Sequence, residues 1–491
     1  MLNVALATWQ WSELWQFWPH VGAVLLTLLT LVASAHAVLH KRDTRAAIAW
    51  VGVIWLAPIL GTLLYIWLGI NRIRRKARVL RGDQTYALRR EHQNVASDET
   101  IAGVLGDDTH LRELVRVGQK LTGRPLLAGN QLSPLVGGDQ AYPVMLAAIE
   151  AAQQSISLCS YIFNNDPTGR RFADALARAV GRGVQVRVLV DDIGARYSLP
   201  SIIGYLRDAG VPVARFMPAL VPVRFAYSNL RSHRKILVCD GRLGFTGGMN
   251  IRESADFKVK RVASIADVHF RVAGPVVAHL QQVFADDWEY STGESLTGDT
   301  WFPGLEAAGD VLARGLSDGP DEDHDKLRMA LLGALACAES RVQIITPYFL
   351  PDASLITSLN VAAMRGVQVD ILLPRHNNLS LVQWASTALL WQVLEYGCRV
   401  WLVPPPFEHT KLMLVDRVWS LVGSGNWDPR SLRLNFEFNV ECYDRRLAES
   451  LGRVLDEKQS RSQLLTPADV DSRPLPIKLR DGVARLLSPY L

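Results

Sequence analysis

The sequence predicts an α/β protein in which two pseudo-symmetric α-β-α halves face each other, preceded by an N-terminal hairpin of two transmembrane helices. Three observations predict this class. Two long segments near the N-terminus carry no formal charge, strand and helix patterns alternate through most of the remaining chain, and one spaced motif occurs twice. At 491 residues, the chain is also long enough for two or three domains of ordinary size.

The composition excludes several classes of protein. With 49% hydrophobic and 21% charged residues, the chain is too apolar for a disordered protein and too charged for a polytopic transporter. The 53 basic and 48 acidic side chains give a formal net charge of +5, which favours anionic partners such as lipid or nucleic acid. The five cysteines include no C-x-x-C pair, so we expect reduced core residues and neither disulfides nor metal ligands.

Residues 1–72 predict a membrane hairpin with an interfacial N-terminal segment. The uncharged runs Val21–Leu39 and Ala46–Ile70 contain 19 and 25 residues, and each is long enough to cross a hydrocarbon core. Pro58 lies inside the second run, where membrane helices tolerate proline. The first 20 residues contain four tryptophans and neither lysine nor arginine, which is typical of an interface. A cleaved signal peptide and two buried soluble helices are the alternatives.

Basic residues near the second run predict the orientation in the membrane. Lys41, Arg42 and Arg45 lie in the turn between the runs, whereas six basic residues follow the second run between Arg72 and Arg81. The larger cluster favours a main body on the cytoplasmic side of the membrane. Residues 73–130 are polar and predict a basic connector with short helices.

The remaining chain predicts two α/β halves, at residues 131–300 and 301–491. In the first half, the patterns predict strands at Ser155–Phe163 and Val184–Val190 with a helix at Gly169–Val180 between them. The second half repeats this order at Arg341–Ile345, Leu355–Met364 and Val367–Leu373. The alternation predicts βαβ units around a largely parallel sheet in each half.

The C-terminal segment Leu475–Leu491 places apolar residues near helical spacing among basic ones. This pattern predicts an amphipathic helix, which would lie either on the bilayer or against the second half.

A motif of the form H-x-K-x4-D occurs twice, with its two copies 176 residues apart. The copies are His233, Lys235 and Asp240, and His409, Lys411 and Asp416. After each aspartate, six residues intervene before a glycine-rich segment that ends at Asn250 or Asn426. Such a spaced set is hard to obtain twice by chance, so it predicts one catalytic site built by both halves.

The residue types of this motif suit a phosphodiester. In extended His-x-Lys, both side chains point to the same face, so an imidazole and an ammonium group share a pocket. One histidine can act as nucleophile while the other acts as acid and then as base, although symmetry alone does not assign the roles. The lysines would neutralise the non-bridging oxygens, and Asn250 and Asn426 would bind the same phosphate.

Asp240 and Asp416 complete the catalytic signature. Their offset of seven residues from the histidines places them on the opposite strand face, where a structural ion pair or turn contact is expected before direct chemistry. No acidic cluster with metal-ligand spacing accompanies the motifs, so we expect neither a two-metal centre nor a cofactor.

These residues resemble the phospholipase D superfamily, whose signature is the double H-x-K-x4-D followed by G-[GS]-x-N. Within this superfamily, the sequence looks like the bacterial cardiolipin synthases of the two-span type. The resemblance runs from about Lys41 to the C-terminus. The stretches that carry it are Leu68–Asn71, Gly244–Ile251, Thr346–Phe349, Asn426–Ser431 and Leu434–Glu437.

The resemblance implies a metal-independent condensation of two phosphatidylglycerol molecules into cardiolipin and glycerol through a phosphohistidine. It implies that His233 is the nucleophile, that His409 is the acid and base, and that Glu437 orients an active-site histidine. Thr410 and Trp427 depart from the family pattern, which leaves the acceptor lipid open. A phospholipase D-type hydrolase, and after it a nuclease, are the alternatives; no nucleic-acid partner is expected and the oligomeric state stays open.

Overall fold

The computed structural model describes residues 11–41, 44–69, 94–218, 230–256, 264–320 and 325–488. The chain forms two compact units. The N-terminal unit comprises Met1–Lys76 with Leu220–Ser228, and the larger unit comprises Ala77–Ala219 with Asn229–Leu491. The predicted interfacial residues before Trp11 and the basic cluster Arg72–Arg81 lie outside the described residues. The predicted domain boundaries at residues 72, 130 and 300 stay predictions.

In the N-terminal unit, only one helix is long and apolar enough to cross a membrane among the described residues. It is the Trp18–His40 part of α1 (Trp11–His40). The second predicted span is instead divided into α2 (Thr44–Leu56) and α3 (Pro58–Leu64), which continues as the π-helix η1 (Tyr65–Gly69). The division falls at Ala57, with φ −139° and ψ 76°, because Pro58 disfavours helical geometry in the preceding residue.

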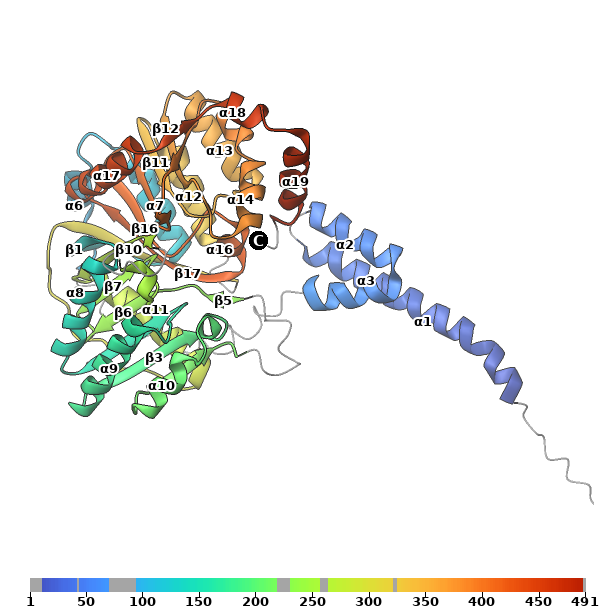
Figure 1. Cartoon of the computed structure of the whole chain (residues 1–491), viewed down its shortest axis with the longest axis horizontal. Helices are drawn as coiled ribbons and strands as arrows, with labels where there is room; N and C mark the ends of the chain where they lie inside the picture. Colours follow the sequence, from blue (N-terminus) through green and yellow to red (C-terminus); the bar gives the residue numbers. More distant parts are fainter. Residues whose placement is uncertain are drawn as a thin grey trace, which may run out of the picture. The chain divides into compact units, whose positions relative to one another are not determined.

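The two parts of the divided segment fold back on each other (Figure 1). A Cβ atom on Gly61 would lie 2.2 Å from the carbonyl oxygen of Val53, so the absence of a side chain permits close contact between α2 and α3. Tyr65 is buried, and its ring centroid lies 5.4 Å from that of Trp50. The tyrosine hydroxyl also lies 2.7 Å from His36 Nδ1 of α1. The segment therefore returns towards the end of α1 from which it started.

Within its described residues, the larger unit contains a mixed sheet of 16 strands, in which each half repeats one strand order. In the first half the order is β1 (Leu127–Val136), β9 (Val268–Ala273), β7 (Leu243–Gly247), β6 (Ile236–Cys239), β2 (Ser155–Ser160), β3 (Gln185–Asp191) and β4 (Val213–Phe216). In the second half it is β10 (Val311–Asp318), β17 (Asn435–Tyr443), β16 (Trp419–Gly423), β15 (Leu412–Val415), β11 (Arg341–Ile345), β12 (Gln368–Pro374), β13 (Arg399–Val403) and β18 (Gln463–Leu465).

The prediction of a largely parallel sheet is wrong for the motif-bearing strands. Strands β2, β3 and β4 are parallel, as are β11, β12 and β13, but β6, β7, β15 and β16 pair antiparallel with their neighbours. Only three residues connect β6 to β7, and a connection this short joins only antiparallel strands. Asp240 and Asp416 occupy these turns with φ of 52° and 51°, a region that aspartate tolerates better than most residues.

Strand β1 joins the two halves. It pairs with β10 from Leu127 to Asn130 and with β9 from Gln131 to Val136. Each half also has its own apolar core. The first core is lined by α8 (Gly138–Ala151), α9 (Pro167–Gly181) and α10 (Ile202–Asp208), and the second by α6 (Asp98–Leu105), α7 (Leu111–Thr122), α12 (Lys326–Cys337) and α13 (Ala353–Met364). The helices of the predicted connector thus pack with the second half.

The predicted strands and helices that flank the motifs are present, with ends that local chemistry explains. Helix α9 begins after Asp166, whose carboxylate accepts the Gly169 N–H at 2.9 Å, with Pro167 in the first helical position. Asp352 caps α13 in the same way. The other described helices are α11 (Val277–Thr292), α14 (Ser380–Thr387), α15 (Trp391–Leu394), α16 (Pro429–Arg433), α17 (Arg445–Ser460), α18 (Pro467–Asp471) and α19 (Leu475–Leu486).

Candidate active site

Each motif histidine follows a short strand that pairs with a strand of the opposite half, in the large sheet for His233 and in a separate two-stranded sheet for His409. His233 follows β5 (Arg231–Ser232), which pairs in parallel with β17. His409 follows β14 (Phe407–Glu408), which pairs in parallel with β8 (Ile265–Ala266). The exchange continues through the histidine backbones, because the His233 N–H donates to Phe436 at 2.9 Å and the His409 N–H donates to Ala266 at 2.7 Å. Each half therefore holds the histidine of the other.

A carboxylate from the opposite half also holds each imidazole ring. His233 Nδ1 lies 2.9 Å from Glu437 Oε2, and His409 Nδ1 lies 2.7 Å from Asp267 Oδ2. Because an ionised carboxylate only accepts hydrogen bonds, we assign the proton to Nδ1 and the lone pair to Nε2 in both rings. Lys411 Nζ, a donor, lies 3.0 Å from the same His409 nitrogen, but it also donates to the His409 carbonyl oxygen, so we assign the Nδ1 proton from the shorter Asp267 contact. Burial raises the pKa of Asp267, and the Lys411 charge opposes this shift.

Glu437 is fixed by more than its histidine. Its carboxylate accepts hydrogen bonds from Ser424 Oγ at 2.5 Å, Ser431 Oγ at 2.7 Å and Asn435 Nδ2 at 3.2 Å. Burial acts to raise the pKa of Glu437, but His233, Lys235 and the Ser424 hydroxyl hold that pKa below its usual value. Ser424 reaches Glu437 from the end of β16, which lies close to β17, since a Cβ on Gly423 would lie 2.4 Å from the Phe438 carbonyl oxygen.

The motif lysines and histidines are buried together. Burial lowers the pKa of Lys235 to about 7 and that of Lys411 to about 8. Burial also lowers the pKa of His233 to about 4 and, together with the Lys411 charge, holds the pKa of His409 well below its usual range. The histidines are thus neutral. A bound anion would stabilise the charged forms of the two buried lysines. In the described part of the chain, no three His, Cys, Asp or Glu residues are placed to hold a metal ion.

The two motif asparagines differ in their contacts. The Asn250 side-chain oxygen accepts the Ile162 N–H at 3.1 Å, so its amide nitrogen is the group that can donate to a ligand. The Asn426 side-chain oxygen is buried and has no hydrogen-bond partner within the described residues. Burying an amide oxygen without a hydrogen bond costs free energy, so we expect a ligand or a water molecule to donate a hydrogen bond to it.

The structure does not bring the motif aspartates together with the histidines. Asp240 follows Lys235 by five residues, on the order of 16 Å along a strand. Its carboxylate accepts the N–H groups of Gln153, Gln154 and Ser155 at 3.0, 2.7 and 3.0 Å. Asp416 similarly accepts the N–H groups of residues 339, 340 and 341 at 2.9, 2.8 and 2.8 Å. Both aspartates thus make the turn contacts expected before direct chemistry, at the start of β2 and β11. A direct catalytic role for them stays a prediction.

Replacing such an aspartate should cost stability. In Asp416→Ala, three backbone N–H groups and His110 Nε2, which lies 2.8 Å from the carboxylate, lose their acceptor. We expect the free energy of unfolding to fall by about 3 kcal/mol. Denaturant unfolding of the purified protein measures the change, with Asp310→Ala at an exposed position as the control. Equal midpoints for the two variants would contradict the structural role.

Aromatic rings flank both imidazoles. The Tyr161 ring lies edge-on to His233 at a centroid distance of 5.1 Å, and Lys235 Nζ lies 5.4 Å from its centroid. The Tyr348 and Phe407 rings lie 6.2 and 5.9 Å from His409. These rings restrict access of water to the histidines. Tyr161 and Asp267 were missed in the sequence; for Asp267 the only local signal is its position just before the strand Val268–Ala273.

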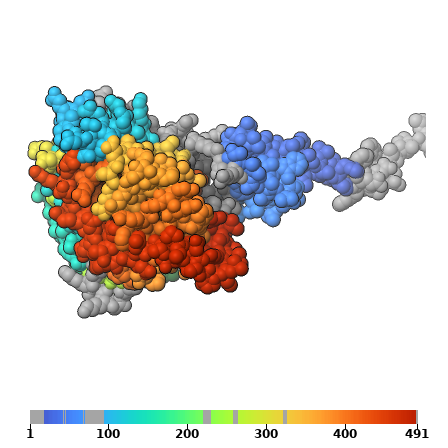
Figure 2. Space-filling view, turned by 90° about the horizontal axis from the view of Figure 1, so that it is seen from above, coloured from blue at the N-terminus to red at the C-terminus, as the bar shows by residue number. Residues whose placement is uncertain are grey.

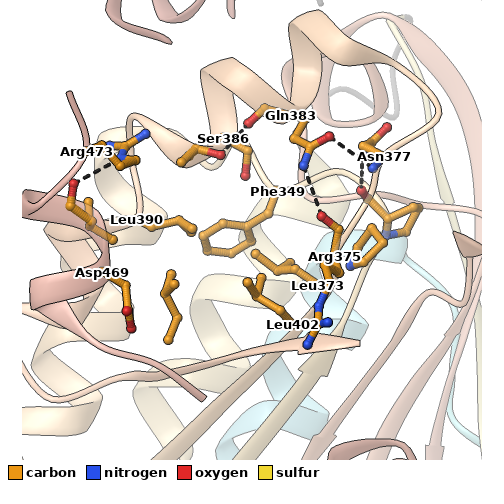
Figure 3. A pocket seen from close by; sticks show the side chains of 15 residues that line it. Phe349, Leu373, Arg375, Asn377, Gln383, Ser386, Leu390, Leu402, Asp469 and Arg473 are labelled. Carbon is orange, nitrogen blue, oxygen red and sulfur yellow. Dashed lines mark hydrogen bonds between the residues drawn. The ribbon is translucent and has the colours of Figure 1, made fainter. Parts of the chain in front are cut away.

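A cavity of about 120 Å³ is lined by Pro347 and Phe349, the sequence neighbours of Tyr348 (Figure 3). Its floor is apolar and includes Phe349, Leu373 and Leu402, and neither motif histidine lines it. Two polar side chains of its lining bond to nearby backbone: Gln383 Nε2 donates to the Arg375 carbonyl oxygen at 3.0 Å, and Asn377 Nδ2 donates to the Pro347 carbonyl oxygen at 2.7 Å. The Asn377 contact therefore holds Pro347, next to the tyrosine whose ring flanks His409.

Comparison with known proteins agrees with this geometry. A family model described as "Cardiolipin synthase, PLD-like domain" matches residues 145–288 and 331–458, which carry both motifs. A second model, described as "Phospholipase_D-nuclease N-terminal", matches residues 28–69.

Similarity to individual proteins extends over nearly the full chain. Cardiolipin synthase A of Pseudomonas putida is 31% identical over 473 residues, which cover 95% of this chain and 97% of that protein. Cardiolipin synthase of Geobacillus kaustophilus is 30% identical, covering 96% and 93%. The crystal structure of phosphatidylserine synthase from Haemophilus influenzae shares the fold, with a TM-score of 0.60 at 16% identity over 77% of this chain and 100% of that chain. Because the match takes in both motif-bearing halves and the N-terminal helices, the chain belongs to the cardiolipin synthase family of phospholipase D-like proteins.

Proposed function

We propose that the chain is a phosphatidyltransferase that condenses two phosphatidylglycerol molecules into cardiolipin and glycerol. One observation carries the proposal: two neutral, buried histidines are each oriented through Nδ1 by a carboxylate of the opposite half, beside two buried lysines. This arrangement leaves one Nε2 for nucleophilic attack and the other for proton transfer. The relatives named cardiolipin synthase support the choice of lipid substrates.

In the first step, His233 Nε2 attacks the phosphorus atom of one phosphatidylglycerol. A P–N bond forms, and the P–O bond to the head-group glycerol breaks. The bound phosphate anion favours the protonated form of His409, which donates its Nε2 proton to the departing glycerol oxygen. Lys235 and Lys411 neutralise the non-bridging oxygens, and Asn250 donates a hydrogen bond to them.

In the second step, a hydroxyl of another phosphatidylglycerol replaces the glycerol. His409, now neutral, accepts the hydroxyl proton while the oxygen attacks phosphorus and the P–N bond breaks. Cardiolipin leaves, and His233 returns to its neutral form. The assignment of the nucleophile to His233 rests on the resemblance to the superfamily.

The activity test uses the purified protein with phosphatidylglycerol and a chelator, following lipid products and free glycerol together. We expect cardiolipin and glycerol in equal amounts. Phosphatidic acid with glycerol, and no cardiolipin, would make water the acceptor and the protein a hydrolase. Cleavage of single-stranded DNA without lipid turnover would favour the nuclease alternative.

The lysine pKa values predict the alkaline side of the pH profile. Lys235 and Lys411, with pKa values of about 7 and about 8 in the free protein, lose their charges as the pH rises through this range. We expect kcat/KM to fall above about pH 7, whereas His233, with a pKa of about 4, remains an unprotonated nucleophile there. In Lys235→Arg the guanidinium does not titrate, so the fall should begin at higher pH. A wild-type kcat/KM that stays constant to about pH 9 would contradict this prediction.

We propose that the N-terminal unit anchors the protein in the bacterial inner membrane, with the larger unit in the cytoplasm. Helix α1 supplies one span, while α2 and α3 enter the bilayer and return as a bent pair in place of a second span. Helix α2 has 13 residues and α3 has 7, so each alone is shorter than the roughly 20 residues that one span needs. Both ends of the bent pair then lie on the cytoplasmic side of the membrane. Lys41 and the basic residues after Ile70 therefore both follow the positive-inside rule.

The position of Lys41 distinguishes this arrangement from two straight spans. In Lys41→Cys, we expect a membrane-impermeant maleimide to label residue 41 in inside-out vesicles and not in intact spheroplasts. Two straight spans with a cytoplasmic body would place residue 41 outside and reverse the result. The parent protein without this substitution corrects for labelling of its five native cysteines, four of which are buried.

A further inference from the structure

Helix α19 packs one face against the larger unit. Asp481 and Ala484 are 1% and 2% exposed, and Ala484 joins a cluster with Val382 and Ala385 of α14. Arg480 extends over the Trp384 ring, 4.4 Å from its centroid. The helix is therefore a fixed part of the fold.

The opposite face of α19 is an apolar stripe that is open to solvent, and Figure 2 shows the C-terminal residues, in dark red, at the surface. At 100° per residue, the members of this stripe fall within an arc of about 120°. They are Leu475, Leu479, Val483, Leu486 and Leu487, which are 67%, 61%, 63%, 72% and 44% exposed. Single exposed apolar residues are ordinary, but a continuous stripe of this kind marks an interaction surface.

The charges of α19 indicate what covers the stripe. Lys478 and Arg485 lie along one side of it and Arg480 along the other. The single acidic residue of the helix, Asp481, is buried and paired with Arg473 and Arg480. A row of apolar side chains flanked by basic residues, with no exposed carboxylate, fits the interface of an anionic bilayer. A protein partner would meet the same row of leucines, but it would leave the two basic borders unexplained.

We propose that the apolar stripe of α19 lies in the interface of an anionic phospholipid bilayer and brings the larger unit onto the membrane. This proposal rests on the proposed function only in that the substrate is an anionic phospholipid. The contact is coupled to the site: Tyr348, whose ring flanks His409 at 6.2 Å, packs on the same cluster as Ala484. Membrane contact at α19 would thus bring lipid head groups to the side of the larger unit where Tyr348 flanks His409.

Nitroxide scanning of the full-length protein in nanodiscs containing phosphatidylglycerol tests the proposal. Labels replace Leu475, Leu479, Val483 or Leu486 in turn, in a background in which the half-buried Cys337 is serine. The matched control is Met364 on α13, which is 60% exposed, close to the 61% of Leu479. We expect the ratio of oxygen to nickel-chelate collision rates to be several-fold higher at the stripe than at Met364.

The outcomes separate the alternatives. Equal ratios at the stripe and at Met364 would place the stripe in water and overturn the proposal. Low collision rates with both reagents at the stripe would mean that protein covers it, such as a second copy of the chain, and would also overturn it. A high ratio in purely zwitterionic nanodiscs that does not rise with phosphatidylglycerol would remove the assigned role of the basic borders. The measurement needs no turnover, so it can fail or succeed independently of the proposed activity.

Discussion

His233→Ala is expected to abolish phosphatidyl transfer, and His409→Ala is expected to leave a phosphatidyl group bound to His233. Without the His233 imidazole no P–N bond forms, so turnover should fall by at least roughly 10⁴-fold. Without His409, the leaving glycerol and the attacking hydroxyl both lack their proton-transfer partner, so the intermediate should form slowly and persist. The two variants therefore differ in what remains on the protein.

Intact-protein mass spectrometry after incubation with phosphatidylglycerol detects the bound group, and acid lability identifies the P–N bond. His376→Ala is the control, because this histidine is exposed and belongs to neither motif. A phosphatidyl group retained by His233→Ala and not by His409→Ala would reverse the two roles. Retention by neither variant, with full activity lost in both, would argue against a covalent intermediate of this lifetime.

Glu437→Gln is expected to lower kcat by between roughly 10² and 10⁴-fold, with little change in KM. The glutamine amide can donate a hydrogen bond to His233 Nδ1, which would move the ring proton to Nε2 and remove the attacking lone pair. The loss of negative charge also weakens the stabilisation of the imidazole as it becomes a phosphorylated cation. Asp267→Asn should have the same effect on His409.

Rapid quenching distinguishes these two variants if His233 is the nucleophile. Glu437→Gln should slow formation of the phosphatidyl-enzyme, whereas Asp267→Asn should slow its breakdown and increase its steady-state amount. Glu449→Gln, on the exposed side of α17, is the control. Unfolding midpoints are compared as well, because Glu437 binds three further donors and a loss of folded protein would also lower the rate. A reduced rate with unchanged single-turnover kinetics would assign Glu437 to stability alone.

The parts of the fold that depend on local patterns could be predicted from the sequence. The strand at Arg341–Ile345 has the predicted bounds, and the helix predicted at Leu355–Met364 begins only two residues earlier, because burial and capping act within a few residues. The sharp bend at Ala57 was not predicted. Proline in a membrane helix is also compatible with a mild kink. Here the close packing of Gly61 on Val53 accompanies a reversal of the chain direction between α2 and α3.

The site could be predicted only where its residues share a motif. His233 and Lys235 can be identified from their spacing, because the same spacing recurs at His409 and Lys411. The pairing of Asp267 with His409 crosses 142 residues of sequence and depends on β8 lying beside β14, which no local pattern states. Repeated spacing can also have a structural cause. Asp240 and Asp416 recur in the motif because each occupies the turn between two strands of its half.

The exchange of β5 and β14 between the halves has a consequence for the order of biosynthesis. The carboxylate that prepares His233 for attack is added to the chain 204 residues later, and the strand that receives β5 is added with it. A ribosome-bound chain that has completed only its first half carries a histidine without its orienting partner. The nascent protein therefore lacks the His233–Glu437 pair until translation is almost finished, and we expect no turnover before then.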